Sequence, residues 1–268
     1  MKKNYLTGHN LENLRKYGKQ PYNVVLVHGG PGAAGEMAQV ALELSHRFGI
    51  LEPLQTEKNV DGLLDELKNV FEKYADFPVT LVGFSWGAWL SLIFTSKYSE
   101  LISKLILISS GPFEQKYAEN IMDVRLSRLS KDERIKFELF LRDLESTKVQ
   151  NRNAAFARLG KLISKSDAYE PIEYTDEINC DYDIFRNVWE QASELRKSGE
   201  LLNYAKKIKC PVIAIHGDYD PHPSEGVEEP LSKYIDDFHF YLLKNCGHKP
   251  WIEKHAKDKF YEILKREL

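Results

Sequence analysis

The sequence predicts an α/β protein in which helices cover both faces of a mostly parallel sheet. Runs rich in Val, Ile and Leu occur at 23–28, 79–84, 104–110 and 212–217, with a further run at 238–244. In the first four runs, polar and apolar residues alternate little, which is typical of strands buried on both faces. Helical patterns lie between the runs, and strands that alternate with helices favour a parallel sheet.

The individual elements follow in chain order. The run at 23–28 leads into a glycine-rich loop, and GILEPLQ (49–55) is a weaker strand candidate because Pro53 confines it to an edge or ends it. From 60 to 74 the apolar residues form one stripe of an amphipathic helix. The segment 88–98 is apolar nearly all round and predicts a central buried helix.

The alternation of strand and helix patterns stops between residues 112 and 207, where the chain becomes polar, charged and mostly helical. Ser130 and Glu133 stand three apart in SKDE, the pattern of a capping box that starts a helix. We therefore predict a core domain made of 1–111 and 208–268, with 112–207 inserted between two strands as a helical cap.

Composition narrows the class of partner. The 268 residues carry a net charge of −3, which gives no reason to expect nucleic acid or an anionic membrane. The N-terminus has no apolar signal region, and no run reaches the length of a membrane span. The cysteines Cys180, Cys210 and Cys246 form no CxxC pair, which argues against zinc and disulfides. A cytoplasmic protein without metal or cofactor is expected.

The motif GFSWG places Ser85 between Gly83 and Gly87, where a strand runs directly into a helix. A serine hydroxyl is a weak nucleophile unless it stands clear of its backbone beside a base. A sharp strand-to-helix turn exposes the hydroxyl, and glycine two residues to either side relieves the crowding. The motif alone arises by chance in some chains, but this context predicts that Ser85 is a nucleophile.

The loop HGGPG (28–32) follows the first good strand and predicts an oxyanion hole. Catalysis at an acyl group needs two N–H donors where negative charge develops. The backbone amides of Gly30 and of Trp86, the residue after the nucleophile, are the candidates. A generic Gly-Pro turn and a phosphate loop are the alternatives, but neither of the common phosphate-binding glycine motifs is present.

A general base and a carboxylate are also required. His248 lies in a loop after the last strand run, and HGDYD offers Asp218 and Asp220 after an earlier run. Hydrolases on parallel sheets use the chain order serine, acid, histidine. His28 and His216 are expected to bond neighbouring polar groups instead.

In this order, HGGPG, GFSWG, GDYD and GH (247–248) make the chain resemble the α/β-hydrolase superfamily along nearly its whole length. The resemblance implies an α/β-hydrolase fold with a helical cap, and its G-x-x-D pattern favours Asp220 over Asp218 as the acid. HGGPG with Trp86 resembles the proline iminopeptidase branch, which removes N-terminal residues from small peptides. That branch usually carries a DQRG stretch and G-G-S-W-G, whereas this chain has GILEPLQTEKNVDG (49–62) and GFSWG.

The branch binds the free α-amino group with cap carboxylates. The candidates in this chain are Glu145, Glu170, Glu173, Asp181, Asp183 and Glu190. The substrate pocket is expected to include Trp89, Trp189 and Trp251. We therefore expect a serine hydrolase of small esters, amides or short peptides that acts through Ser85, Asp220 and His248. A carboxylesterase without peptidase activity and a non-catalytic ligand-binding homologue are the alternatives, and the oligomeric state is left open.

Overall fold

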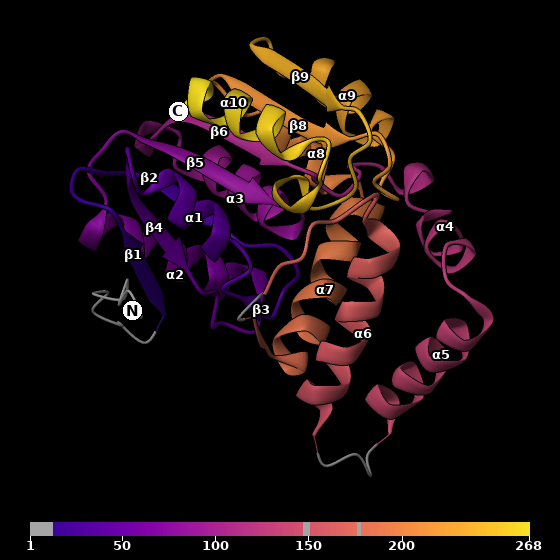
Figure 1. The fold of residues 1–268 in the computed structure, drawn as a ribbon. Helices are drawn as coiled ribbons and strands as arrows, with labels where there is room; N and C mark the ends of the chain where they lie inside the picture. Colours follow the sequence, from indigo (N-terminus) through magenta and orange to yellow (C-terminus); the bar gives the residue numbers. More distant parts are fainter. Residues whose placement is uncertain (1–12, 147–150, 176–177) are drawn as a thin grey trace, which may run out of the picture.

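The computed structural model describes residues 13–146, 151–175 and 178–268, and its centre is a seven-stranded sheet (Figure 1). The order is β1-β4-β2-β5-β6-β8-β9, and only β1 runs antiparallel to its neighbour. The strands of this sheet are β1 (Leu14–Tyr17), β2 (Tyr22–Val27), β4 (Gly49–Pro53), β5 (Val79–Phe84), β6 (Ile102–Ile108), β8 (Val212–Gly217) and β9 (Phe238–Leu243). The predicted α/β class with a mostly parallel sheet is confirmed.

Helices account for most of the remaining chain. The α-helices are α1 (Ala38–Leu44), α2 (Val60–Tyr74), α3 (Trp86–Lys97), α4 (Ile121–Ser127), α5 (Lys131–Glu145), α6 (Arg152–Asp167), α7 (Tyr182–Lys197), α8 (Glu200–Ala205), α9 (Glu225–Ser232) and α10 (Lys257–Glu267). Three short 3-10 turns are η1 (Ser99–Leu101), η2 (Gln115–Tyr117) and η3 (Pro250–Ile252). Within the described ranges, no helix combines the length and apolar character needed to cross a membrane.

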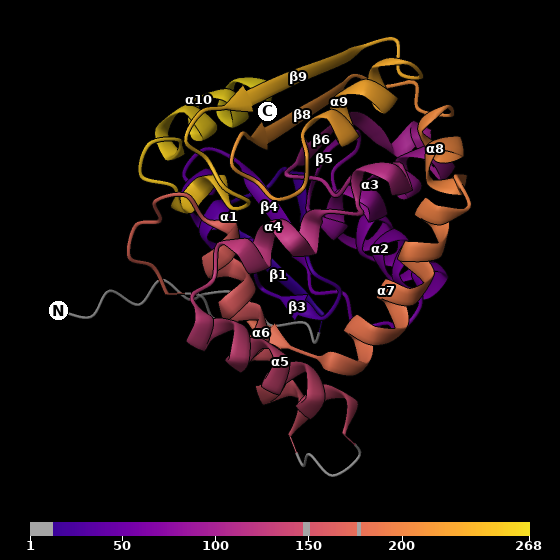
Figure 2. The same cartoon turned by 90° about the vertical axis from the view of Figure 1, so that its right-hand side faces the viewer.

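Both faces of the sheet are buried, and alternate residues of one strand serve different faces. Val24 and Leu26 of β2 pack with α1, η3 and α10, whereas Val25 and Val27 pack with α2, α3, α8 and α9. Polar and apolar residues do not alternate in these strands because neither face of the sheet meets water. The result is a three-layer arrangement of helices, sheet and helices (Figures 1 and 2).

The weak strand candidate at 49–55 forms β4, which lies inside the sheet between β1 and β2. Pro53 is its last residue, so the missing N–H of proline falls where the strand ends. Before β2, the described chain supplies the short strand β1, which pairs antiparallel with β4.

The segment between β6 and β8 is helical, as its composition predicts, but its two halves pack differently. Helices α5 and α6, which we call the arm, pack around a cluster of their own that includes Phe137, Leu144 and Leu159. Helices α7 and α8 instead join the cluster on α2 and α3 through residues such as Val188 and Leu201. In Figures 1 and 2 the arm extends away from the sheet, while α8 lies against the sheet helices.

Candidate active site

Ser85 lies at the junction between β5 and α3, because the strand ends at Phe84 and the helix begins at Trp86. Its φ angle of 53° is in the left-handed region that non-glycine residues rarely adopt. A Cβ on Gly83 would lie 2.3 Å from the carbonyl oxygen of Gly87, and a Cβ on Gly87 would lie 2.3 Å from that of Val27. The two glycines are therefore required by the close approach of backbone at this turn.

Ser85 is hydrogen-bonded to His248, and His248 to Asp220. His248 Nε2 lies 3.0 Å from Ser85 Oγ, and His248 Nδ1 lies 2.7 Å from Asp220 Oδ2. The three side chains come from the ends of β5, β8 and β9, which are parallel strands and so reach the same edge of the sheet. Ser85, Asp220 and His248 lie far apart in sequence but are adjacent in space.

Asp218 has a different role from Asp220. Its carboxylate accepts a hydrogen bond from the backbone N–H of Cys246 at 3.3 Å and lies 3.7 Å from Lys244 Nζ. The Asp220 side chain is fully buried and faces His248. Of the two acids that the HGDYD stretch offers, only Asp220 contacts the imidazole.

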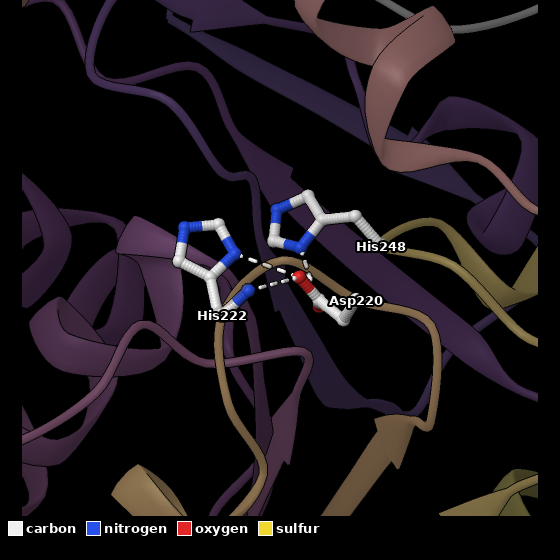
Figure 3. Close-up of side chains that lie close together, drawn as sticks. All are labelled: Asp220, His222 and His248. Carbon is white, nitrogen blue, oxygen red and sulfur yellow. Dashed lines mark hydrogen bonds and ion pairs between the residues drawn. The ribbon is translucent and has the colours of Figure 1, made fainter. Parts of the chain in front are cut away.

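His222 is a second histidine on the same carboxylate, and the sequence analysis did not identify it. Its Nδ1 lies 2.8 Å from Asp220 Oδ1, and its backbone N–H donates to the same oxygen at 2.9 Å. The imidazoles of His222 and His248 lie 4.6 Å apart, and in Figure 3 both point Nδ1 at Asp220 and the other nitrogen away from it. The available signal was the D-P-H spacing, since an aspartate often bonds the backbone two residues on.

The hydrogen bonds to Asp220 fix the protonation of both rings. An ionised carboxylate only accepts, so Nδ1 of His222 and of His248 must each carry a proton. When His248 is neutral, its Nε2 is therefore free to accept the hydroxyl proton of Ser85. His216 Nε2 donates to the His222 carbonyl at 2.8 Å and lies 3.5 Å from Asp220 Oδ2, which adds a further dipole beside the carboxylate.

The three groups of this network have different pKa values. Burial by itself raises the pKa of Asp220, but the charges and hydrogen bonds of His248 and His222 bring it well below its ordinary value. Burial lowers the pKa of His248, yet Asp220 outweighs burial and the pKa is raised from 6.5. For His222 burial dominates and lowers the pKa to about 4. At neutral pH His222 is uncharged, whereas His248 is the group poised to gain a proton.

The HGGPG loop lies beside the serine and is held from two sides. Gly30 and Gly32 have positive φ angles of 32° and 76°. The backbone N–H of Asp181 donates to the Gly32 carbonyl at 2.8 Å, next to the short sheet of β3 (Ala33–Ala34) and β7 (Asn179–Cys180). The insertion therefore helps to shape the loop that carries the proposed oxyanion donor Gly30.

Gln55 connects the HGGPG loop to the turn at Ser85. The sequence analysis did not identify this residue. Its Nε2 donates to the His28 carbonyl at 2.9 Å, and its Oε1 accepts from Trp86 Nε1 at 2.9 Å. The side chain is buried and the residue has a φ angle of 52°. One amide thus connects the two segments whose N–H groups are expected to form the oxyanion hole.

A cavity of about 190 Å³ opens beside Ser85. The described residues that line it are Ser85, Trp86, Trp89, Gly111, Ala118, Ile121, Met122, Arg125, Trp189, Arg196 and His222. Trp89 and Trp189 are stacked in its wall with ring centroids 6.0 Å apart. The cavity is small and its lining includes three tryptophans, so a small acyl or leaving group fits it.

Trp251 does not line this cavity, contrary to the sequence-based expectation. It is 2% exposed, and its ring lies edge-on to Phe84 with centroids 4.7 Å apart and tilted to Phe260 with centroids 6.1 Å apart. Phe84 in turn contacts the His248 ring at 4.9 Å. Proximity to His248 in sequence suggests a pocket position, but the η3 turn directs the indole into the core under the catalytic loop.

The six candidate carboxylates of the insertion do not line the cavity either. Glu145, Glu173, Asp183 and Glu190 are exposed. Glu170 forms an ion pair with Lys254 and a hydrogen bond with His255, and Asp181 caps α7 by accepting from the Ile184 N–H at 3.0 Å. Helix caps and solvated faces account for them, because acidic residues are abundant on helical surfaces.

The loop that carries His248 is hydrogen-bonded to the last residue of the arm and to the segment that follows it. The His248 N–H donates to the Asp167 carbonyl at 2.9 Å. The buried Glu253 carboxylate accepts from the backbone N–H groups of Tyr169, Glu170 and Gly247 at 2.8, 2.9 and 2.9 Å. This carboxylate therefore fixes the position of the His248 loop relative to the insertion.

Asp220, His222 and His248 also have the spacing of a metal site, with ligand atoms within 4.8 Å of one another. The same atoms make the short hydrogen bonds described above. The donor set therefore fits either a divalent cation or the proton network, and the Ser85 contact of His248 favours the network.

Comparison with known proteins places the chain in a family. A family profile described as alpha/beta hydrolase fold matches residues 22–255. A proline iminopeptidase of Lactobacillus crispatus is 23% identical, over 91% of this chain and 89% of that protein. The crystal structure of VinJ has a TM-score of 0.64 at 16% identity, covering 95% of this chain and 93% of the other. Est816, an N-acyl homoserine lactone degrading enzyme, has a TM-score of 0.63 at 11% identity, covering 95% and 96%.

The chain therefore belongs to the α/β-hydrolase family of enzymes, and proline iminopeptidases are among its relatives. The sequence-based expectation of this superfamily and of that branch among its relatives is confirmed. The solved structures, at such low identity, establish the fold alone.

Proposed function

We propose that this protein is a serine hydrolase that transfers the acyl group of a small ester or amide to water. The hydrogen-bonded chain from Ser85 through His248 to Asp220 is the observation that carries the proposal. Ser85 Oγ attacks the carbonyl carbon while His248 Nε2 takes its proton. The buried Asp220 stabilises the imidazolium that forms and holds it in the required tautomer.

The remaining steps follow from the same geometry. The amides of Gly30 and Trp86 donate to the oxyanion, assisted by the positive end of α3. His248 then protonates the leaving group, and the acyl group stays on Ser85 as an ester. Water, deprotonated by His248, attacks that ester and releases the carboxylic acid and the free serine.

Two substrate classes are consistent with the family. The iminopeptidase relatives favour an N-terminal peptide bond, whereas Est816 acts on a lactone. An amine terminus needs an acidic partner, and no carboxylate is among the described residues that line the cavity. We therefore favour an ester or amide without a free α-amino group, with the iminopeptidase reaction as second candidate.

The experiment combines covalent labelling with a substrate panel. A fluorophosphonate probe is expected to label the wild-type chain at Ser85, and p-nitrophenyl acetate and aminoacyl-naphthylamides report esterase and peptidase activity. Ser85→Ala should abolish labelling and lower kcat by at least about a thousandfold. Ser96→Ala is the matched control, because Ser96 lies on the same helix and bonds only the Ile93 carbonyl.

Each outcome is decisive. A wild-type chain that neither reacts with the probe nor cleaves any ester would contradict the proposal and favour a ligand-binding role. Cleavage of aminoacyl-naphthylamides at rates above those of acyl esters would establish the second candidate instead.

A further inference from the structure

Arg196 of α7 lies in the wall of the cavity beside Ser85 and is half-buried. Its guanidinium lies over the Trp89 ring, 5.4 Å from the centroid, and its Nε donates to Gln115 Oε1 at 3.1 Å. Both contacts orient the charged group, because a guanidinium stacks on indole and Gln115 fixes one edge. The side chain is thus held in place before any substrate enters.

This guanidinium has no carboxylate partner in the part of the chain that the structure describes. Burial alone lowers the pKa of Arg196, with no acidic group opposing the shift. Arginine nevertheless stays charged in proteins. A cation partly removed from water without a counter-ion is unfavourable, and an anion that enters the cavity relieves that cost.

Arg125, the other arginine in the cavity wall, is different. Its Nη2 lies 2.6 Å from Asp167 Oδ2, its Nε donates to both carboxylate oxygens, and the Asp167 side chain is buried. The charge of Arg125 is therefore neutralised within the protein. The lining of the cavity that contains Ser85 therefore carries an uncompensated positive charge at Arg196.

We propose that Arg196 binds a carboxylate carried by the substrate, so that the preferred substrates are small esters or amides bearing a negative charge near the scissile bond. This inference rests on the proposed hydrolase function. A planar guanidinium can bind a carboxylate through two parallel hydrogen bonds. The stacked rings of Trp89 and Trp189 supply the apolar surface beside that charge.

The test uses pairs of substrates that differ only in charge. On the acyl side, p-nitrophenyl monoesters of succinic, glutaric and adipic acid are compared with p-nitrophenyl butyrate, valerate and hexanoate. On the leaving-group side, 4-acetoxybenzoate is compared with its methyl ester. After subtraction of uncatalysed hydrolysis, kcat/KM for the anionic member of at least one pair is expected to be higher by about 10- to 100-fold.

Variants then assign the preference to one residue. Arg196→Met keeps the stem that packs on Trp89 and is expected to remove the preference. Arg196→Lys keeps a charge without the planar fork and should retain part of it. Arg186→Met is the control, because Arg186 is exposed on the same helix, and it should leave the ratio within about twofold. Circular dichroism and fluorophosphonate labelling verify that each variant is folded.

The outcomes separate this inference from the proposed function. A wild-type chain that cleaves neutral esters as well as anionic ones in both series overturns the inference and leaves the hydrolase standing. A preference that survives in Arg196→Met also overturns it. A wild-type chain that cleaves neither class and resists the fluorophosphonate removes both.

Discussion

Helix α3, which follows the nucleophile, and helix α5 of the arm show how differently two parts of this molecule are built. Every residue of α3 from Trp86 to Thr95 is buried, whereas α5 buries only Phe137 and Leu144. Ile135 of α5 is 56% exposed. A helix enclosed all round cannot shift without disturbing the sheet, while a helix held by a narrow stripe can. The proposed nucleophile Ser85 is therefore attached to a helix that is enclosed on all sides.

The arm contacts the loop that carries His248 through Asp167. The backbone of Asp167, at the end of α6, accepts from His248, and its side chain pairs with Arg125 of α4. The arm also packs on α7, because Phe156 of α6 contacts Tyr182 and Phe185.

Among the variants that test this comparison of core and arm, Asp220→Asn is expected to have the largest effect on activity. The variant should lower kcat by about ten-thousandfold, because an amide in this position no longer stabilises the imidazolium. The pH profile should change as well. Wild-type kcat/KM should fall as the pH drops through the raised pKa of His248, above 6.5, since the protonated ring cannot accept a proton. Without the carboxylate, burial dominates and the inflection should move below 6.5.

Asp218→Asn is the matched control, because Asp218 lies in the same loop and bonds Cys246 rather than His248. It should leave the pH inflection unchanged. An unshifted inflection in Asp220→Asn would contradict the assigned role of the carboxylate.

A smaller loss of activity is expected from Gln55→Leu. Loss of the amide releases the His28 carbonyl and Trp86 Nε1, so the proposed oxyanion donors are held less well. We expect kcat to fall by about 10- to 100-fold while KM changes by less than about twofold. Steady-state kinetics with p-nitrophenyl acetate measures the two separately.

Gln39→Leu serves as the control for this positioning role, because Gln39 is a part-exposed glutamine that bonds the Thr175 carbonyl. A rise in KM with unchanged kcat for Gln55→Leu would show that Gln55 affects ground-state binding rather than the oxyanion hole.

The smallest effect is expected in the arm. Ser130 and Glu133 form the capping box at the start of α5, and Ser130→Ala should destabilise that helix by about 1 kcal/mol. Hydrogen exchange should speed up in α5 and α6 but not in β5 or β8, and kcat/KM should change by less than about twofold. Ser127→Ala, at an exposed serine just before the box, is the control. A large loss of activity in Ser130→Ala would break the distinction between arm and core.

Most of the core could be predicted from sequence, because its signals are local. The predicted runs 79–84 and 212–217 coincide with β5 and β8, and the capping box at Ser130 is present. The glycines around Ser85 identify a turn whose backbone contacts demand them. By contrast, Gln55 and Arg196 belong to no motif that spacing reveals, and their partners come from distant segments. His222 lies two residues after its partner Asp220, in a spacing that predicts a local turn but not a second imidazole on the carboxylate.

The amino-acid sequence by itself determined the parallel sheet, the serine turn and the order of the acid and the histidine, since hydrophobic period and glycine placement act over a few residues. Only the tertiary structure decided that Trp251 packs under Phe84 and that Arg196 lines the cavity with no counter-ion among the described residues. Those features depend on which strand ends and helices become neighbours. Long-range packing sets that proximity, and no local pattern encodes it.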